Sequence, residues 1–125
     1  MGQVNGDAIE FCITTTIKSD PIGEVCYVLA KVLCANGLLN VKFREMLEDA
    51  IIKKDKTGLF CYLFAKNVPG ANIQKLENAV SQKDPNGQIC YLFAKDVKGA
   101  DIQSLKDAIV KKDITGDVCA KFTQL

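Results

Sequence analysis

The stretch CYLFAK at residues 61–66 recurs letter for letter at residues 90–95, and a looser copy, CYVLAK, occupies residues 26–31. A motif that recurs together with its surrounding sequence is typical of repeat architectures, in which stacked copies bury one continuous core. The surroundings do recur here, because residues 55–80 align with residues 84–109 at a constant spacing of 29. The sequence therefore predicts a repeat protein.

Two further copies complete the array. An earlier copy begins at Asp20 and is six residues longer than the others, and a last one runs from Asp113 to Leu125. We divide the chain into a single domain made of an N-terminal cap (1–19), three repeats (20–54, 55–83 and 84–112) and a C-terminal cap helix (113–125).

Each repeat is predicted to contain two helices. The first opens at an aspartate that serves as N-cap, and it closes at a glycine suited to a left-handed C-cap, Gly70 or Gly99. The second starts at Asn72 or Asp101 and carries apolar residues at helical spacing. The predicted N-caps are Asp20, Asp55, Asp84 and Asp113, with Pro21 and Pro85 at the first helical position. Alternation typical of strands is missing, so we expect an all-α fold of about eight helices.

The two ends of the array depart from the repeat pattern. In the last copy Ala120, Lys121 and Thr123 replace tyrosine, leucine and alanine, and near the N-terminus Thr15 and Thr16 stand where apolar residues would. Terminal repeats need a polar outer face, so these changes predict caps at both ends. Polar caps argue against end-to-end stacking and leave a monomer or a side-by-side dimer open.

Composition and charge narrow the function classes. The 125 residues are 48% hydrophobic and 25% charged, as in a globular domain, and the net charge is only +1. A nearly neutral chain has no large field to attract nucleic acid or an anionic membrane. Neither a signal peptide nor a membrane span is evident, which predicts a soluble cytoplasmic protein with no membrane partner.

The extended pattern CYxFAKxVxGAxIxxLxxAI covers nearly the whole chain from Asp20 onward. It resembles short two-helix repeats, HEAT-like in layout, that occur in bacterial and bacteriophage proteins mostly of unassigned function. The resemblance implies a short right-handed α-solenoid whose exposed faces bind another macromolecule. For a phage protein it is also compatible with inhibition of a host defence system, for instance as an anti-CRISPR acting in the host cytoplasm.

The residues offer little for catalysis or metal binding. The chain has no histidine and no CxxC pair, so neither a nucleophile–histidine pair nor a structural zinc site is expected. Four of the six cysteines occupy one repeat position (Cys26, Cys61, Cys90 and Cys119), while Cys12 and Cys34 fall outside it. We interpret them as small buried residues, and we expect no enzyme activity, no metal and no cofactor.

Two surface features are candidate binding sites for a protein. Tyr and Lys recur four residues apart on the first helix of each repeat, which predicts a Tyr/Lys stripe. The longer first repeat carries an irregular stretch, residues 33–44, with apolar anchors and an arginine fork. The candidate residues are Tyr27, Lys31, Tyr62, Lys66, Tyr91 and Lys95 of the stripe, and Leu38, Leu39, Phe43 and Arg44 of the irregular stretch.

Each of the two features also has a purely structural explanation. The tyrosines could pack against the next repeat under the lysine stems, and the longer stretch could fill a gap beside the N-terminal cap. The preferred hypothesis is a non-enzymatic repeat module that binds a protein partner, with phage-encoded inhibition as its sharper form. The alternatives are an RNA- or DNA-binding repeat that stacks bases on the tyrosines, and a structural module that associates with itself.

Overall fold

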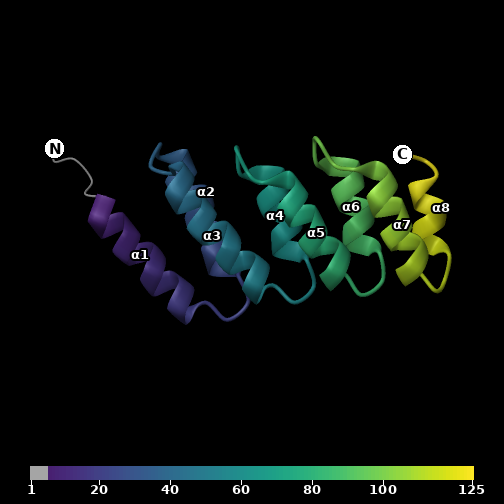
Figure 1. Cartoon of the computed structure of the whole chain (residues 1–125), viewed down its shortest axis with the longest axis horizontal. Coiled ribbons are helices and arrows are strands. Elements are labelled where there is room, and N and C mark those ends of the chain that lie inside the picture. The colour runs from purple at the N-terminus through teal and green to yellow at the C-terminus, as the bar shows by residue number, and fades with distance from the viewer. Residues whose placement is uncertain (1–5) are drawn as a thin grey trace.

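The computed structural model describes residues 6–125, so the first five residues of the predicted N-terminal cap lie outside the described residues. Within that range the chain forms helices only (Figure 1). Their bounds are α1 (Gly6–Ser19), α2 (Glu24–Ala35), α3 (Val41–Lys54), α4 (Leu59–Asn67), α5 (Ile73–Lys83), α6 (Gln88–Asp96), α7 (Ile102–Lys112) and α8 (Asp117–Phe122). The prediction of an all-α chain with eight helices is confirmed.

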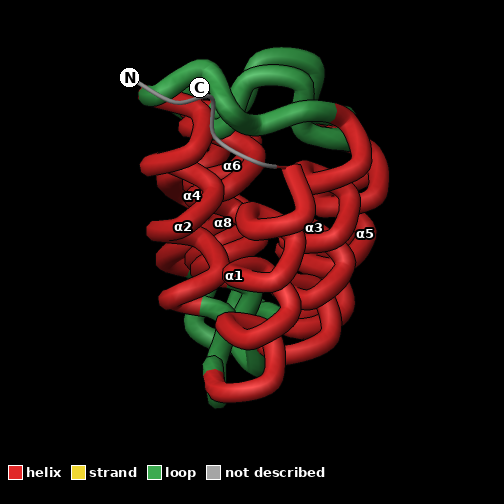
Figure 2. Tube along the Cα trace, turned by 90° about the vertical axis from the view of Figure 1, so that its left-hand side faces the viewer, coloured by secondary structure: helices red, strands yellow, loops and turns green. Residues whose placement is uncertain are grey.

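The helices follow one another in a row, with α1 at one end and α8 at the other (Figure 1). Viewed along the row, α2, α4, α6 and α8 lie on one side, and α3 and α5 on the other (Figure 2). We call α2, α4, α6 and α8 the first helices and α1, α3, α5 and α7 the second helices. The most extensive contacts are within the pairs α2/α3, α4/α5 and α6/α7. Each predicted repeat is therefore a helix pair.

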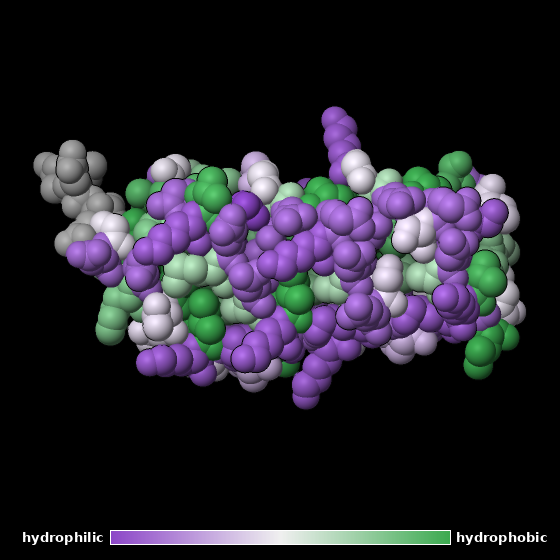
Figure 3. Space-filling model, in the orientation of Figure 1, coloured by the Kyte–Doolittle hydropathy of each residue, from purple (hydrophilic) through white to green (hydrophobic). Residues whose placement is uncertain are grey.

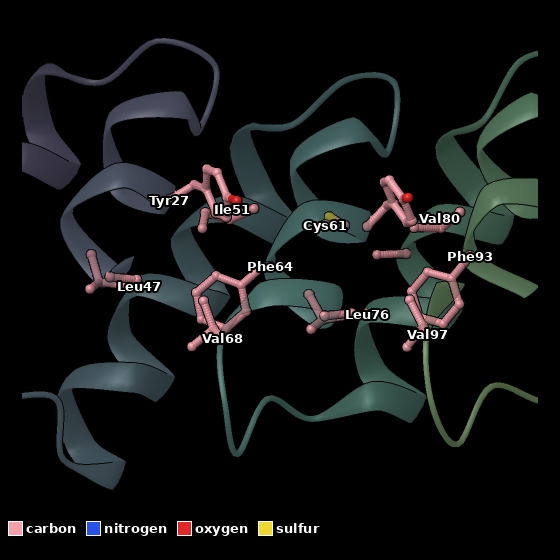
Figure 4. Packing of buried hydrophobic residues seen from close by; sticks show 14 of the residues in the cluster. Tyr27, Leu47, Ile51, Cys61, Phe64, Val68, Leu76, Val80, Phe93 and Val97 are labelled. Atoms are coloured by element: carbon pink, nitrogen blue, oxygen red, sulfur yellow. The ribbon is translucent and has the colours of Figure 1, made fainter. Parts of the chain in front are cut away.

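The core repeats with the sequence. Phe64 and Phe93 are fully buried at equivalent positions of α4 and α6, and each lies beside the valine that follows its helix, Val68 or Val97 (Figure 4). Three of the second helices, α3, α5 and α7, supply a leucine that is also fully buried, at positions 47, 76 and 105. Burying one such leucine contributes about 2 kcal/mol, so this recurring apolar layer stabilises every helix pair.

The first helices begin three residues later than the aspartate pattern predicts. The N-cap residue of α4 is Gly58 in a left-handed conformation, and Asp55 is the C-cap of the preceding helix α3. Gly23, Gly87 and Gly116 are likewise the N-caps of α2, α6 and α8, so the prediction of Asp20, Asp55, Asp84 and Asp113 as N-caps is wrong. Pro21 and Pro85 lie in the connecting bends.

The aspartates nevertheless bind the helix starts from their own position. Asp55 accepts hydrogen bonds from the backbone N–H of Thr57 (3.2 Å), Gly58 (3.1 Å) and Cys61 (2.9 Å). Asp20, Asp84 and Asp113 repeat this arrangement. A buried carboxylate needs such donors to offset its desolvation. We call the aspartate at each of these four junctions the junction aspartate.

Gly58 is required at its junction for two reasons. Its φ of 90° is accessible to glycine at little cost, and a Cβ atom built on it would lie 3.3 Å from the Cα of Val80. The first helix therefore starts in close contact with the second helix of its own pair. A side chain at this position would separate the two helices.

The second helices start as predicted. Asn72 accepts a hydrogen bond from the backbone N–H of Lys75 (3.1 Å), and Asp101 accepts one from Ser104 (3.1 Å), so both are N-caps. The predicted ends of the first helices need a correction. Gly70 and Gly99 do have positive φ, but α4 and α6 already end at Asn67 and Asp96, because Val68 and Val97 turn to an extended conformation.

Two contacts join each pair to the next. Lys54 Nζ donates to the backbone oxygen of Asp20 (2.7 Å), and Lys83 Nζ does the same to Asp55 (2.6 Å). On the opposite edge, the Glu48 carboxylate accepts from the backbone N–H of Asn72 (2.9 Å). None of the helices within residues 6–125 has the length and apolar content needed to cross a lipid bilayer.

The repeat provides a matched test of the junction aspartate. Asp55→Ala leaves buried N–H groups without an acceptor, so we expect it to lower the free energy of unfolding by about 3 kcal/mol in urea denaturation. Asp113→Ala removes the same hydrogen bonds at the exposed last junction, where water can replace them, and should cost clearly less. Equal losses for the two variants would contradict a special role for burial.

Asp20 gives a prediction about pH. Burial alone raises the pKa of this carboxyl, but the hydrogen bonds from Cys26, Ile22 and Gly23 outweigh it and leave the pKa below its usual value. A lowered pKa means that the carboxylate stabilises the fold fully above about pH 4 and less as the pH falls through the lowered pKa. Asp20→Asn should therefore be less stable than the parent by about 1–2 kcal/mol at pH 7. The difference should shrink in urea titrations at pH 2–3, and a constant difference would refute this linkage.

Candidate protein-binding interface

The loops inside the helix pairs lie along one edge of the row. They span residues 36–40, 68–72 and 97–101 and are at the top of Figure 1. The junctions with their aspartates occupy the opposite edge. On the loop edge the backbone N–H groups of Asn72 and Asp101 bind Glu48 and Glu77 of the preceding pair, and most of the loop residues are exposed or half-buried. Exposed loops on a rigid scaffold are a common place for binding residues.

Two hollows adjoin one another on this edge, and both are lined by Pro69 and Gly70. The larger has a volume of about 560 Å³ and reaches Lys66, Asp96 and Lys98. The smaller has a volume of about 170 Å³. We define the loop-edge surface by six residues that line these hollows: Leu39, Val41, Arg44, Lys66, Pro69 and Lys98. It offers apolar contact between positively charged groups.

Arg44 is already engaged within the protein. Its Nη1 lies 2.9 Å from Glu48 Oε2, and its Nη2 lies 3.7 Å from Glu45 Oε1. The methylene stem faces Gly70, since a Cβ built on that glycine would lie 3.8 Å from Arg44 Cδ. Only 14% of the side chain is exposed. Arg44 thus shapes the smaller hollow, while its guanidinium fork, predicted to bind a partner, is used on Glu48.

The next pair lacks this arginine. Glu77 occupies the position of Glu48 and accepts from the backbone N–H of Asp101 (2.6 Å), but Ile73 stands where Arg44 would. One oxygen of Glu77, Oε2, is buried without a hydrogen-bond partner. Burial raises the pKa of Glu77, which a charged neighbour such as an arginine would oppose.

The tyrosines of the predicted stripe lie between helix pairs. Tyr27 and Tyr62 are buried. Asn67 Nδ2 donates to the Tyr27 hydroxyl (2.8 Å), and the Tyr62 hydroxyl donates to Asp96. Burial, together with Asp96, raises the pKa of Tyr62. These two rings join successive first helices and do not present their faces to a ligand.

The lysines of the stripe remain at the surface. Lys31 Nζ lies 5.4 Å from the ring centre of Tyr27, and Lys66 Nζ lies 5.7 Å from that of Tyr62. Lys95 is exposed, and Tyr91 is half-buried. The lysine charges of the stripe are therefore accessible, whereas two of its three aromatic rings are buried.

The predicted apolar anchors divide in a similar way. Phe43 is buried in the core, so the prediction that it lies on a binding surface is wrong. Leu38 and Leu39 are half-buried, and Leu39 lines the smaller hollow together with Arg44. The structure therefore brings Leu39, Arg44 and Lys66 to neighbouring hollows, although the sequence analysis assigned them to two separate features.

Sequence reasoning missed three residues of the loop-edge surface: Val41, Pro69 and Lys98. Pro69 and Lys98 are equivalent loop positions of two repeats, and a comparison of loop residues at equivalent positions would have singled them out. For Val41 the signal in the sequence was weaker: it is one of several apolar residues in the irregular stretch. Only the structure shows that its side chain remains 65% exposed.

The three fully buried cysteines are not activated as nucleophiles. Burial, together with the adjacent junction aspartate, raises the pKa of Cys26 and of Cys90 to about 12. Cys61 is shifted in the same direction. These thiols are protonated at neutral pH, and a thiol is a far weaker nucleophile than a thiolate. Within residues 6–125, no three His, Cys, Asp or Glu side chains gather as metal ligands.

The rest of the surface offers weaker candidates. A further hollow of about 560 Å³ lies between α5 and α7, and most of the residues that line it are polar or charged, as in Asn78, Gln82 and Asp107. The face seen in Figure 3 is mainly hydrophilic, with small separate hydrophobic patches.

Comparison of the chain with protein-family models, with curated proteins and with solved structures gave no match. The loop-edge surface is therefore selected on its geometry alone.

The difference between Glu48 and Glu77 can be tested by converting one site into the other. Arg44→Ile leaves the buried Glu48 without its cation, and we expect the free energy of unfolding to fall by about 3 kcal/mol. Adding Glu48→Gln should restore part of this loss, because the amide carries no charge. Lys42→Ala, which breaks the exposed pair with Glu10, is the control and should change little. If Arg44→Ile is as mild as this control, the buried pair does not stabilise the fold.

Proposed function

We propose that this chain is a non-enzymatic helical-repeat module, a short right-handed α-solenoid, that binds a partner protein along the loop-edge surface. The observation that carries the proposal is the pair of adjoining hollows on either side of Pro69 and Gly70. A partner segment that crosses both would meet apolar contacts at Leu39 and Val41 and the cation of Lys98. Concave apolar surfaces with few polar groups are the usual form of a binding site.

The charges favour an acidic partner segment. Lys66 and Lys98 line the larger hollow, where Asp96 is the acidic residue and already accepts from Tyr62. Lys66 Nζ lies 3.8 Å from Asp96, so part of its charge is compensated, whereas Lys98 is exposed. A carboxylate of the partner near Lys98 would complement this surface. Inhibition of a host machine, as the resemblance implies, would be one form of such binding.

Nucleic acid is the weaker candidate. Tyr27 and Tyr62 are packed between helix pairs, so they cannot stack with bases as single-strand binders require. The net charge of +1 also limits attraction to phosphates. Binding of nucleic acid is therefore treated as one outcome of the experiment described next.

The experiment is a quantitative capture from bacterial lysate with the tagged chain, at physiological and at high salt, with and without nuclease. One substitution addresses each hollow, Val41→Glu and Lys98→Glu, and both positions are exposed, so both variants should fold. Lys53→Glu, exposed on the opposite edge, is the matched control. We expect the tagged chain to capture a protein, and nuclease treatment should not reduce this capture. The Val41→Glu and Lys98→Glu variants should retain at least tenfold less of that protein than the control variant does.

Other outcomes would overturn the proposal. Loss of the captured material with nuclease would identify nucleic acid as the ligand. Equal retention by all three variants would place the binding surface elsewhere on the molecule.

A further inference from the structure

The two ends of the row are each half of a helix pair. Among the described residues 6–125, α1 at one end is a second helix without a first helix, and it packs on α2 and α3. At the other end α8 is a first helix without a second, and it packs on α6 and α7. The ends lie at opposite extremes of the molecule (Figure 1). What would cover each end can be deduced from the complete pairs, because they show which residues meet at every junction.

The exposed face of α2 is a contact face of the repeat. In α4, Phe60 and Asn67 face the preceding first helix: the Phe60 ring lies 6.4 Å from that of Tyr27, and Asn67 donates to the Tyr27 hydroxyl. The residues of α2 at these positions are Val25 and Val32. They are 49% and 50% exposed, and Val28 between them is 49% exposed. This face has the position of a contact between first helices and is apolar, and no first helix within residues 6–125 covers it.

The neighbouring helix α1 is uncovered on its corresponding side. Cys12 lies eight residues before a junction aspartate, where the three complete pairs have Leu47, Leu76 and Leu105. Those leucines are fully buried, whereas Cys12 is exposed. Within residues 6–125, α1 therefore has no first helix of its own pair.

The C-terminal end shows the opposite vacancy. A Cβ on Gly58 or Gly87 would contact Val80 or Ile109 of the second helix in the same pair, but around Gly116 there is nothing within 4 Å. Cys119 and Phe122 of α8 are partly exposed, although the cysteine and phenylalanine at these positions of α4 and α6 are fully buried. An apolar pocket of about 100 Å³ opens there against α7.

The residues at the two vacancies complement each other. Thr16 of α1 is the β-branched residue at the position of Val80 and Ile109, and it could fill the space opposite Gly116. Tyrosine of one first helix pairs with Asn67 or Asp96 of the next, but Ala120 replaces the tyrosine in α8 and Val32 replaces the polar partner in α2. Both members of the polar pair are changed to apolar residues, and they lie at opposite ends of the chain.

We infer that the ends bind a second copy of this chain head to tail, so that α8 of one copy and α1 of the next form one complete helix pair. The contact repeats the internal contact between helix pairs and leaves a free end on each copy, which makes the assembly open-ended. This inference is independent of the loop-edge surface, which lies along the side of the row.

The polar residues that predicted caps do not block this contact. Lys121 is exposed and occupies the position of Leu63 and Leu92, which belongs to the stripe of each first helix on the side of the preceding first helix. Thr16 keeps the shape of valine and loses part of its apolar character. The contact should accordingly be weaker than an internal one and depend on concentration.

The test uses variants in which only one end is blocked. Val28→Glu blocks the face of α2, and Ala120→Glu blocks that of α8; both positions are exposed, so folding should persist and is checked by circular dichroism. The same charge is used at both ends so that the blocked ends cannot attract each other. The control is Leu59→Glu, an exposed leucine at the start of the internal helix α4, where α2 already has a glutamate.

Sedimentation velocity at increasing concentration, up to about 100 µM, is the measurement. For the parent chain and the control we expect the mean mass to rise past twice the monomer mass without reaching a limit. Each blocked variant alone should remain monomeric, and an equimolar mixture of the two should form dimers and nothing larger, since each contributes one intact end.

Three results would overturn the inference. The parent chain could stay monomeric over the whole range. The blocked variants could associate as the parent does, or their mixture could remain monomeric, and either result would show that the ends do not meet.

Discussion

At three of the four junctions a buried carboxylate fixes the bend between consecutive helix pairs. Asp20, Asp55 and Asp84 are almost completely buried, and each lies where one second helix ends and the next first helix begins. A carboxylate in such a place is tolerated only if donors surround it. The backbone N–H groups of the bend and of the third helical residue provide them, and they require the chain to turn at a glycine with positive φ. The recurrence of Asp, Gly and Cys at fixed spacing follows from this one constraint.

The junction also explains the role of the cysteines. Cys26, Cys61 and Cys90 carry the N–H that reaches the aspartate, and their side chains are fully buried. The position needs a small side chain beside a carboxylate, and a protonated thiol meets that need without introducing a second charge. A row of cysteines in a sequence suggests chemistry, whereas here it results from packing next to an anion.

The loop edge differs more from one pair to the next than the junction edge does. Glu48 has an arginine partner and Glu77 has none, although both bind the start of the next second helix. The longer first pair places Leu39 and Val41 beside Pro69 of the second pair, which creates the smaller hollow. Departures from the repeat thus concentrate on one edge and at the two ends of the row, and these are the surfaces for which we propose partners.

The sequence by itself determined the helical class, the number of helices, the pairing into repeats and the N-caps Asn72 and Asp101, because apolar spacing and capping are local properties of the chain. It also pointed to Leu39, Arg44 and Lys66. Tertiary structure alone decided that Phe43, Tyr27 and Tyr62 are buried, since burial depends on which helix packs opposite. It placed the aspartates before the helix starts, because their carboxylates reach N–H groups up to six residues away. Only the structure showed that the pair formed by Arg44 and Glu48 within α3 is buried, and that residues 6–125 have half a helix pair at each end of the row.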